Sequence, residues 1–181
     1  MEWAEDEVPV VRMFPDYAAT VLWLGGPVDY AECGLSERLI RGLERWEQGY
    51  NDALVDLEWR TPELAAQFTK NGVRLAQQVA RELGEDFEVE FRSYENGAGV
   101  RRFRGKGPGS PAATAAFGQR AADMRDDREQ PARMKAEDEA SGAAGRWYAY
   151  APESGTAFRP GPPGDVGTRP ESPDAADRGE E

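Results

Sequence analysis

The order of apolar and polar residues along the first part of the chain predicts two short strands near the N-terminus. Residues 8–14 and 18–24 are apolar-rich, and the turn-forming residues at 15–17 separate them. The second run has four large apolar residues in succession at 21–24, which is typical of a strand covered on both faces. Two glycines and a proline at 25–27 end it. We therefore expect an N-terminal pair of strands.

A third strand and its return strand are expected shortly before residue 105. Apolar and charged residues alternate between 87 and 92, which indicates a strand with one face in water. Asn96-Gly97 is a strong hairpin signal, and residues 99–104 would form the return strand. A three-residue loop would place Phe91 opposite Phe103, whereas a two-residue loop would place an arginine there. Cross-strand pairing of the aromatic rings favours the three-residue loop.

Two helices are predicted between these strand pairs. The first runs from about residue 37 to 57, with Ser36 as its N-cap and apolar residues at spacings of three and four. The second begins at Pro62 after the N-cap Thr61, and Gly84 is its natural stop. Its predicted apolar stripe comprises Leu64, Phe68, Leu75, Val79 and Leu83.

These elements predict an α+β fold. Two antiparallel helices return the chain to the end of the sheet where the second strand finished, so the third strand runs antiparallel to the second and can lie beside it. We expect a small antiparallel sheet of three to four strands, with a two-helix antiparallel hairpin packed on one face. A largely disordered C-terminal tail would follow.

The composition changes near residue 105. Residues 1–94 carry 19 acidic and 9 basic side chains, whereas residues 95–181 carry 15 and 13 and hold 13 of the 20 glycines. A segment with so few large apolar residues cannot offset the entropy of ordering. We predict an acidic α+β domain at 1–105, a low-complexity linker at 106–145, a docking hairpin at 146–159 and a disordered tail at 160–181, with 108–145 and 160–181 mostly disordered.

Several kinds of catalytic and metal site are excluded by the residue types present. The sequence has no histidine, which excludes Ser-His-Asp and Cys-His nucleophilic sites and helical HExxH zinc sites. Cys33 is the single cysteine, so an intrachain disulfide and a multi-cysteine metal site are also excluded. The glycine-rich run at 99–107 lacks the spacing of a phosphate loop, and no GxGxxG opens a helix. No cofactor and no metal are expected.

Charge and segment length bear on location and on the class of partner. Residues 1–7 lack the basic start and apolar stretch of a signal peptide, and no apolar run is long enough to span a bilayer. We expect a cytoplasmic protein without membrane association. The net charge of −12 argues against general nucleic-acid binding, because affinity for phosphates comes from cations. An acidic surface can instead steer the protein toward basic partners.

Candidate binding residues lie in three places. Loops on a rigid scaffold often carry binding groups, although acidic residues in turns also have an ordinary structural role. Tryptophan and arginine are enriched at the hot spots of protein interfaces. The candidates are Asp16, Tyr17, Asp29, Tyr30 and Glu32 in the loops flanking the second strand, Trp59 and Arg60 between the helices, and Trp147, Tyr148 and Tyr150 in the docking hairpin.

Three functional hypotheses follow. The first is a small non-enzymatic binding protein that offers an acidic face to a basic protein partner, for which an immunity or antitoxin-like inhibitor is one concrete version. The second is a small-molecule-binding domain or modest enzyme in which Asp16, Tyr17, Asp29 and Tyr30 share one pocket, since carboxylates and tyrosines can do acid–base work without histidine. The third is an interaction platform that acts through the C-terminal tail. Oligomeric state is not predicted.

Overall fold

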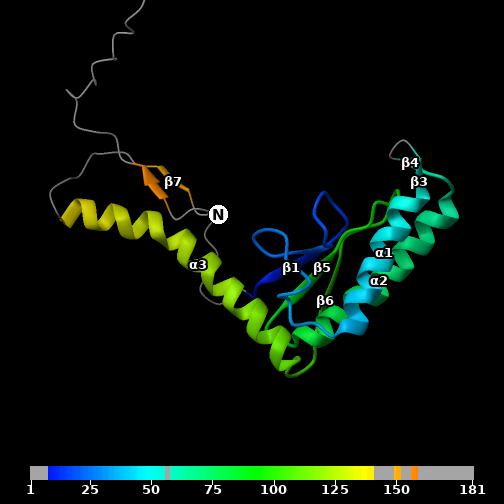
Figure 1. Cartoon of the computed structure of the whole chain (residues 1–181), viewed down its shortest axis with the longest axis horizontal. Helices are drawn as coiled ribbons and strands as arrows, with labels where there is room; N and C mark the ends of the chain where they lie inside the picture. The colour runs from blue at the N-terminus through cyan, green and yellow to red at the C-terminus, as the bar shows by residue number, and fades with distance from the viewer. Residues whose placement is uncertain (1–7, 56–57, 141–148, 152–155, 159–181) are drawn as a thin grey trace, which may run out of the picture. The chain divides into compact units, whose positions relative to one another are not determined.

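The computed structural model describes residues 8–55, 58–140, 149–151 and 156–158. The chain divides into two compact units, and the boundary between them follows Asp126. Most of the described elements belong to the first unit (Figure 1). No helix in the described part of the chain is long and apolar enough to cross a membrane.

A four-stranded mixed sheet forms the centre of the first unit, in the order β2-β1-β5-β6. Its strands are β1 (Val10–Met13), β2 (Leu22–Trp23), β5 (Glu88–Phe91) and β6 (Arg101–Arg104). The α+β class and the number of strands agree with the prediction from sequence. The predicted neighbour was wrong, because β5 lies beside β1 and parallel to it rather than beside β2. The four-residue strand β1 offers β5 a longer partner than the two-residue β2 does.

The hairpin prediction was right about the two strands and wrong about their register. Glu88 faces Arg104, Glu90 faces Arg102 and Val89 faces Phe103, so Phe91 lies opposite Arg101 instead of Phe103. The connection at 92–100 is longer than either loop considered from the sequence. This register places carboxylates opposite arginines, with Arg102 bonded to both Glu88 and Glu90.

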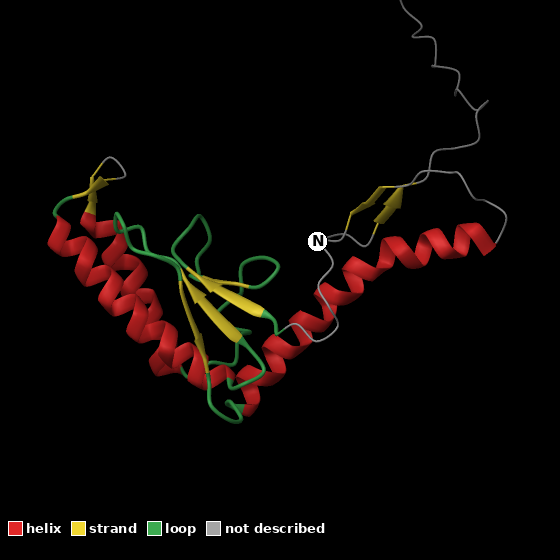
Figure 2. Cartoon of the chain, turned by 180° about the vertical axis from the view of Figure 1, so that it is seen from behind, coloured by secondary structure: helices red, strands yellow, loops and turns green. Residues whose placement is uncertain are grey.

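Helices α1 (Glu37–Ala53) and α2 (Pro62–Leu83) pack against each other on one face of the sheet, as predicted (Figure 2). The N-caps are also as predicted: Ser36 Oγ accepts from the Leu39 N–H, and Thr61 Oγ1 accepts from the Leu64 N–H. Ser36 Oγ also donates to Glu82 Oε1 at 2.6 Å, which joins the start of α1 to the end of α2.

Two details of the predicted helices were wrong. Helix α1 ends at Ala53 instead of residue 57, because Leu54–Val55 (β3) pairs with Glu58–Trp59 (β4) in a separate two-stranded ribbon. Leu64 was predicted in the buried stripe of α2, but it lies in the first turn of the helix and is 40% exposed.

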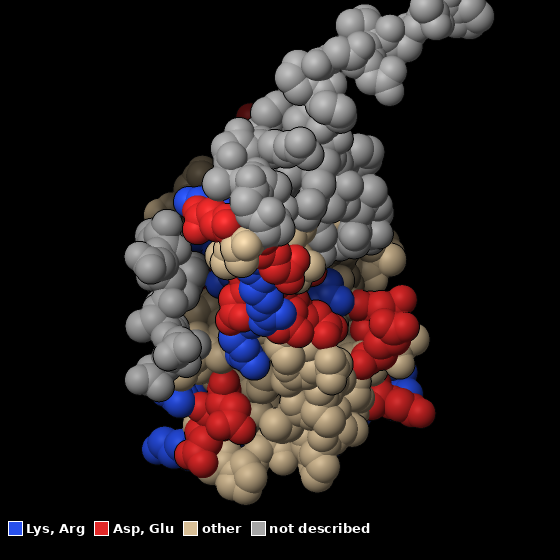
Figure 3. All heavy atoms as spheres, turned by 90° about the vertical axis from the view of Figure 1, so that its left-hand side faces the viewer, with Lys and Arg blue, Asp and Glu red and all other residues tan. Residues whose placement is uncertain are grey.

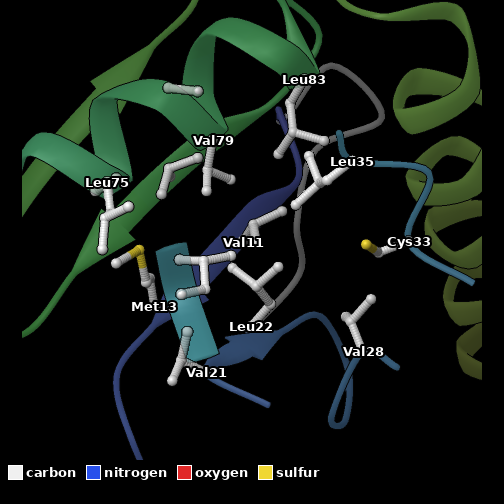
Figure 4. Close-up of a cluster of buried hydrophobic side chains, with 14 of the residues drawn as sticks. Val11, Met13, Val21, Leu22, Val28, Cys33, Leu35, Leu75, Val79 and Leu83 are labelled. Carbon is white, nitrogen blue, oxygen red and sulfur yellow. The ribbon is translucent and has the colours of Figure 1, made fainter. Parts of the chain in front are cut away.

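The core of this unit is continuous from the sheet to the two helices. Figure 4 shows Val11 and Met13 of β1 among side chains of β2, of the 24–36 connection and of α2. Cys33 is buried in this cluster, and its Sγ donates to the Tyr30 carbonyl at 3.3 Å. Burial raises the pKa of the Cys33 thiol, so this side chain is a packed group and not an activated nucleophile.

Helix α3 (Pro111–Ala140) occupies a segment for which the sequence predicted disorder, and that expectation was wrong. Ala113, Phe117 and Ala121 are buried in the core of the first unit, and the Phe117 ring meets that of Phe87 edge-on at 6.0 Å. Arg120 adds two hydrogen bonds to backbone carbonyls of the 24–36 connection. Alanine, arginine and glutamate have high helix propensity, which favours a helix in this segment. The buried Phe117 ring anchors its first turns.

The second unit contains the rest of α3 and an antiparallel strand pair, β7 (Ala149–Ala151) with β8 (Thr156–Phe158). The pair agrees with the hairpin expected in 146–159. Tyr150 is a residue of β7 and lies opposite Ala157. Trp147 and Tyr148 lie outside the described residues, so their proposed docking role stays a prediction.

Candidate protein-binding surface

Three connections meet at the end of the sheet where β1 and β5 finish. Residues 14–21 follow β1, residues 92–100 follow β5, and residues 54–61 join α1 to α2 (Figure 1). The Tyr94 hydroxyl donates to the Pro15 carbonyl at 2.9 Å, and the Trp59 indole N–H donates to the Tyr94 carbonyl at 3.0 Å. We call these three connections, together with the first turn of α2, the loop end.

Aromatic rings in tilted and edge-on contact support the loop end. The Trp59 ring lies 5.0 Å from that of Phe68 and 5.6 Å from that of Tyr50, and the Tyr50 ring lies 5.4 Å from that of Tyr94. A second group surrounds Trp23, whose indole N–H donates to the Phe14 carbonyl at 3.1 Å. Such contacts hold the connections in defined positions, which reduces the entropy lost when a partner binds.

Exposed apolar side chains concentrate on this surface. Within the described ranges, five large apolar residues are exposed, and all five belong to the loop end. Scattered exposed apolar residues are normal on any protein, but their gathering at one end is a mark of an interaction site. They are Tyr17 (83% exposed), Val100 (52%), Val55 (51%), Tyr94 (44%) and Leu64 (40%).

Exposed acidic side chains lie on the same connections and on the first turn of α2. Asp16, Glu58 and Glu63 are exposed and form no ion pair within the described part of the chain. Asp16 Oδ1 accepts from the Tyr17 N–H at 2.9 Å, which orients the exposed ring. Arg60 brings an exposed positive charge to the same surface, and that of Arg92 is paired with Glu90. The loop end therefore combines exposed apolar side chains with mainly negative unpaired ones, which we call its rim.

Tyr94 of the loop end and its ring neighbour Tyr50 of α1 are not acids at neutral pH. Burial raises the pKa of the Tyr50 and Tyr94 hydroxyls above the ordinary value, and the negative charge of Asp16 raises both further. Both hydroxyls therefore stay protonated at neutral pH. The Tyr94 hydroxyl donates a hydrogen bond to the Pro15 carbonyl, which fits a contact surface better than an acid–base centre.

The structure divides the candidate residues from the sequence into separate groups. Asp16, Tyr17, Trp59 and Arg60 come together at the loop end. Asp29, Tyr30 and Glu32 belong to the connection after β2. Asp29 Oδ1 accepts from the Ala31 N–H at 2.8 Å, which is turn chemistry.

Tyr30 has a structural position within that second group. Its hydroxyl oxygen accepts from the Val21 N–H at 3.2 Å. Burial raises the pKa of Tyr30 to about 12, so the hydroxyl does not ionise at physiological pH. The residue supports the backbone between β1 and β2 and offers no acid–base group.

A cavity of about 180 Å³ lies between the connection after β2 and α3. Asp29, Glu32 and Cys33 line it on one side, and Phe117 and Arg120 on the other. Asp16, Tyr17 and Tyr30 are not among its lining residues, so this cavity is not the four-residue pocket of the second hypothesis. Among the described residues, no group of three or more carboxylates and cysteines is placed to hold a metal ion.

On the side drawn in Figure 3, described Asp and Glu side chains lie among Lys and Arg side chains, so this side is not uniformly acidic. Glu37 pairs with Arg41, and Glu88 and Glu90 pair with arginines of the sheet. These ion pairs neutralise part of the negative charge locally.

Sequence reasoning missed four exposed members of the loop end. Leu64 matches the apolar spacing of α2, and Val55 was assigned to α1. Tyr94 and Val100 flank the predicted hairpin signal at 96–97, and a tyrosine beside a turn was a usable sign of exposure. What no local pattern shows is that these residues, far apart along the chain, meet on one surface.

Comparison with known families gives independent support for a protein-binding role. Residues 9–94 match the family described as Serratia CdiI immunity protein-like. A comparison with curated proteins and one with solved structures found no match. The matched segment extends from the residue before β1 to Tyr94, so it contains the 14–21 and 54–61 connections of the loop end. The similarity supports an immunity-protein-like role for the chain.

Proposed function

We propose that this chain is an immunity protein that binds a protein toxin through the loop end. The observation that carries the proposal is that all five exposed large apolar side chains of the described part lie on the three joined connections and the adjoining first turn of α2. The family similarity of residues 9–94 supports the class of partner. Inhibition then follows from covering the toxin's working surface, which needs no catalytic group in this chain.

The rim charges favour a toxin with a basic surface. Asp16, Glu58 and Glu63 would face cations of the partner, while Tyr17 and Leu64 would enter apolar contacts. Charges at the rim of an interface mainly raise the association rate, whereas buried aromatic anchors slow dissociation. The acidic residues would thus guide the encounter, and the apolar residues would hold the complex.

The test uses the candidate toxin encoded by the neighbouring gene. Co-expression with this chain should protect growth, and the purified pair should form a complex. A Tyr17→Ala/Leu64→Ala variant should weaken binding by at least about tenfold, since both side chains are exposed anchors. Calorimetry measures the affinity, and circular dichroism confirms the fold.

A matched control separates this surface from general effects of truncation. Arg38→Ala/Arg45→Ala removes two long exposed side chains from α1, away from the loop end, and should leave affinity unchanged. Equal losses in both double variants would contradict the assignment of the surface. Absence of both protection and complex formation would reject the immunity role.

The charge of the rim has its own test. Asp16→Asn removes the charge while keeping an oxygen that can accept from the Tyr17 N–H. The variant should bind more slowly at low salt and lose part of the salt dependence. Asp86→Asn, an exposed substitution between α2 and β5, is the matched control. Stopped-flow association rates decide, and identical salt dependence in all three proteins would reject a basic partner surface.

A further inference from the structure

Strand β6 is the last strand on its side of the sheet. It pairs with β5, and within the described ranges no strand pairs with its other edge. A free edge presents unpaired backbone N–H and C=O groups in a row, which an extended chain can match. Residues Arg101–Arg104 therefore form a place where a fifth strand would fit.

Helix α2 lies along this edge and makes one wall of a groove. The groove has a volume of about 600 Å³ and is lined by Gln77, Ala80 and Arg81 of α2 and by residues 102–106. Its floor includes the half-buried ring of Phe103, which packs against the core. At Gly105 an added Cβ would lie 2.5 Å from the Ala80 carbonyl oxygen, so the two walls approach closely at this end.

The walls of the groove are positively charged although the whole chain is acidic. Arg81 lines the groove on the side of α2, and Lys70 and Arg74 lie outside the lining residues on the same exposed face of α2, at spacings of four and seven. Arg104 and Lys106 lie on the opposite wall. None of these five cations pairs with a carboxylate in the described part of the chain; Arg104 Nε donates to the Glu85 carbonyl.

We propose that the groove between β6 and α2 binds an extended acidic segment of a partner protein. The segment would add to β6 as a strand and place its carboxylates among the cations of both walls. Alternate side chains of an added strand point to opposite faces, so a segment that alternates acidic and apolar residues fits best. This second surface is independent of the loop end and of the toxin assigned to it.

Two other occupants fit the groove less well. A nucleic acid could use the cations, but phosphates cannot donate hydrogen bonds to strand carbonyls. Among the described residues, Phe103 is the single aromatic residue that lines the groove, so it offers no row of rings on which successive bases could stack. A second copy of this chain would bring β6 beside β6 and set arginines opposite one another. Charge complementarity together with a free strand edge favours an acidic polypeptide.

The experiment uses the full chain and a fluorescent peptide in which Glu and Val alternate. Anisotropy should report saturable binding, while the Lys-Val counterpart and a single-stranded oligonucleotide should bind at least about tenfold more weakly. Amide resonances of residues 101–106 should shift, and the β6 amides should gain protection from hydrogen exchange. The Arg81→Glu/Lys106→Glu variant should bind the peptide at least about tenfold more weakly.

Arg38→Glu/Arg45→Glu is the matched control, since it makes the same change in net charge on exposed positions of α1. Retained peptide affinity in this control supports the groove. The proposal is overturned if both double variants lose affinity equally, if the oligonucleotide binds more tightly than the peptide, or if the shifts map to the loop end. Absence of peptide binding to the wild-type chain also overturns it.

Discussion

Glu90 of β5 is a buried carboxylate among three arginines. Its oxygens lie 3.0 Å from Arg92 Nε, 2.8 Å from Arg102 Nη2 and 4.0 Å from Arg12 Nε. Burial alone would raise the pKa of Glu90, but the hydrogen bonds and charges of Arg92 and Arg102 outweigh it and lower the pKa. The ionised carboxylate thus joins β1, β5 and β6 across the open face of the sheet.

Replacing Glu90 by glutamine should destabilise the fold at neutral pH. The amide keeps the shape but loses charge-assisted hydrogen bonds and leaves the arginines around it unneutralised. A decrease of about 1–3 kcal/mol in the free energy of unfolding is expected from urea titrations at pH 7. Glu88→Gln is the control, because Glu88 is more exposed and contacts Arg102 alone, so its effect should be smaller.

The effect of Glu90 should depend on pH in a defined direction. Its pKa in the folded protein lies below the ordinary 4.5, so its stabilising contribution is complete above that value. The contribution disappears as the pH falls below 4.5 toward the folded pKa. The difference in unfolding free energy between wild type and Glu90→Gln should therefore shrink from pH 7 to pH 3. A constant difference would show that packing, and not charge, is responsible.

At the scale of elements, helix packing depends on glycines with opposite roles. Gly72 lies inside α2, where an added Cβ would be 2.5 Å from the Phe91 ring and 2.7 Å from the Trp46 ring. Gly49 lies inside α1, where an added Cβ would meet nothing within 4 Å. The first glycine lets the helix approach the sheet closely, whereas the second only loosens its helix.

Alanine substitutions at these two positions should change stability in opposite directions. Gly49→Ala should stabilise the protein by about 0.5–1 kcal/mol through helix propensity. Gly72→Ala should destabilise it by about 1–3 kcal/mol, because two aromatic rings must move. Thermal unfolding measured by circular dichroism gives both signs. A stabilised Gly72→Ala protein would contradict the close contact of α2 with Phe91.

Local signals in the sequence predicted the helices and strands better than their arrangement. The caps at Ser36 and Thr61 involve neighbouring residues, so they could be predicted. The pairing of β5 with β1 depends on contacts between distant segments, and a directional argument alone chose the wrong neighbour. Part of the candidate surface, around Asp16 and Trp59, was also predictable. Of its exposed apolar members only Tyr17 was predicted, because the exposure of residues such as Leu64 depends on packing between distant segments.

At the scale of the whole molecule, the first unit extends further than the segment with family similarity. That segment ends at Tyr94, before β6 and α3. Phe117 of α3 is 1% exposed and belongs to the core, and Arg120 bonds to the Leu24 and Pro27 carbonyls. The composition break at 105 therefore does not coincide with the end of the packed structure.

Truncated chains should show how much the start of α3 contributes to the stability of the first unit. A chain that ends after residue 105 loses the buried Phe117 ring and should be destabilised by at least about 3–5 kcal/mol, the range for removal of a large core side chain. A chain that ends after residue 140 keeps these contacts and should unfold like the full protein. Urea titrations of the two truncated chains provide the measurement. Equal stability would show that the start of α3 contributes little.

The place of β1 in the sheet has a consequence for how the chain folds during synthesis. Its parallel partner β5 is far along the sequence, with Val10 opposite Glu88, and both helices lie between them. Contacts between such distant segments form slowly, because a long loop must close first. β1 is synthesised well before β5, so the edge of β1 that pairs with β5 stays unpaired until β5 has been made. The sheet therefore cannot form completely until β5 has been synthesised. Of the strands of this sheet, a nascent chain whose synthesis stops before β5 can pair only β1 with β2.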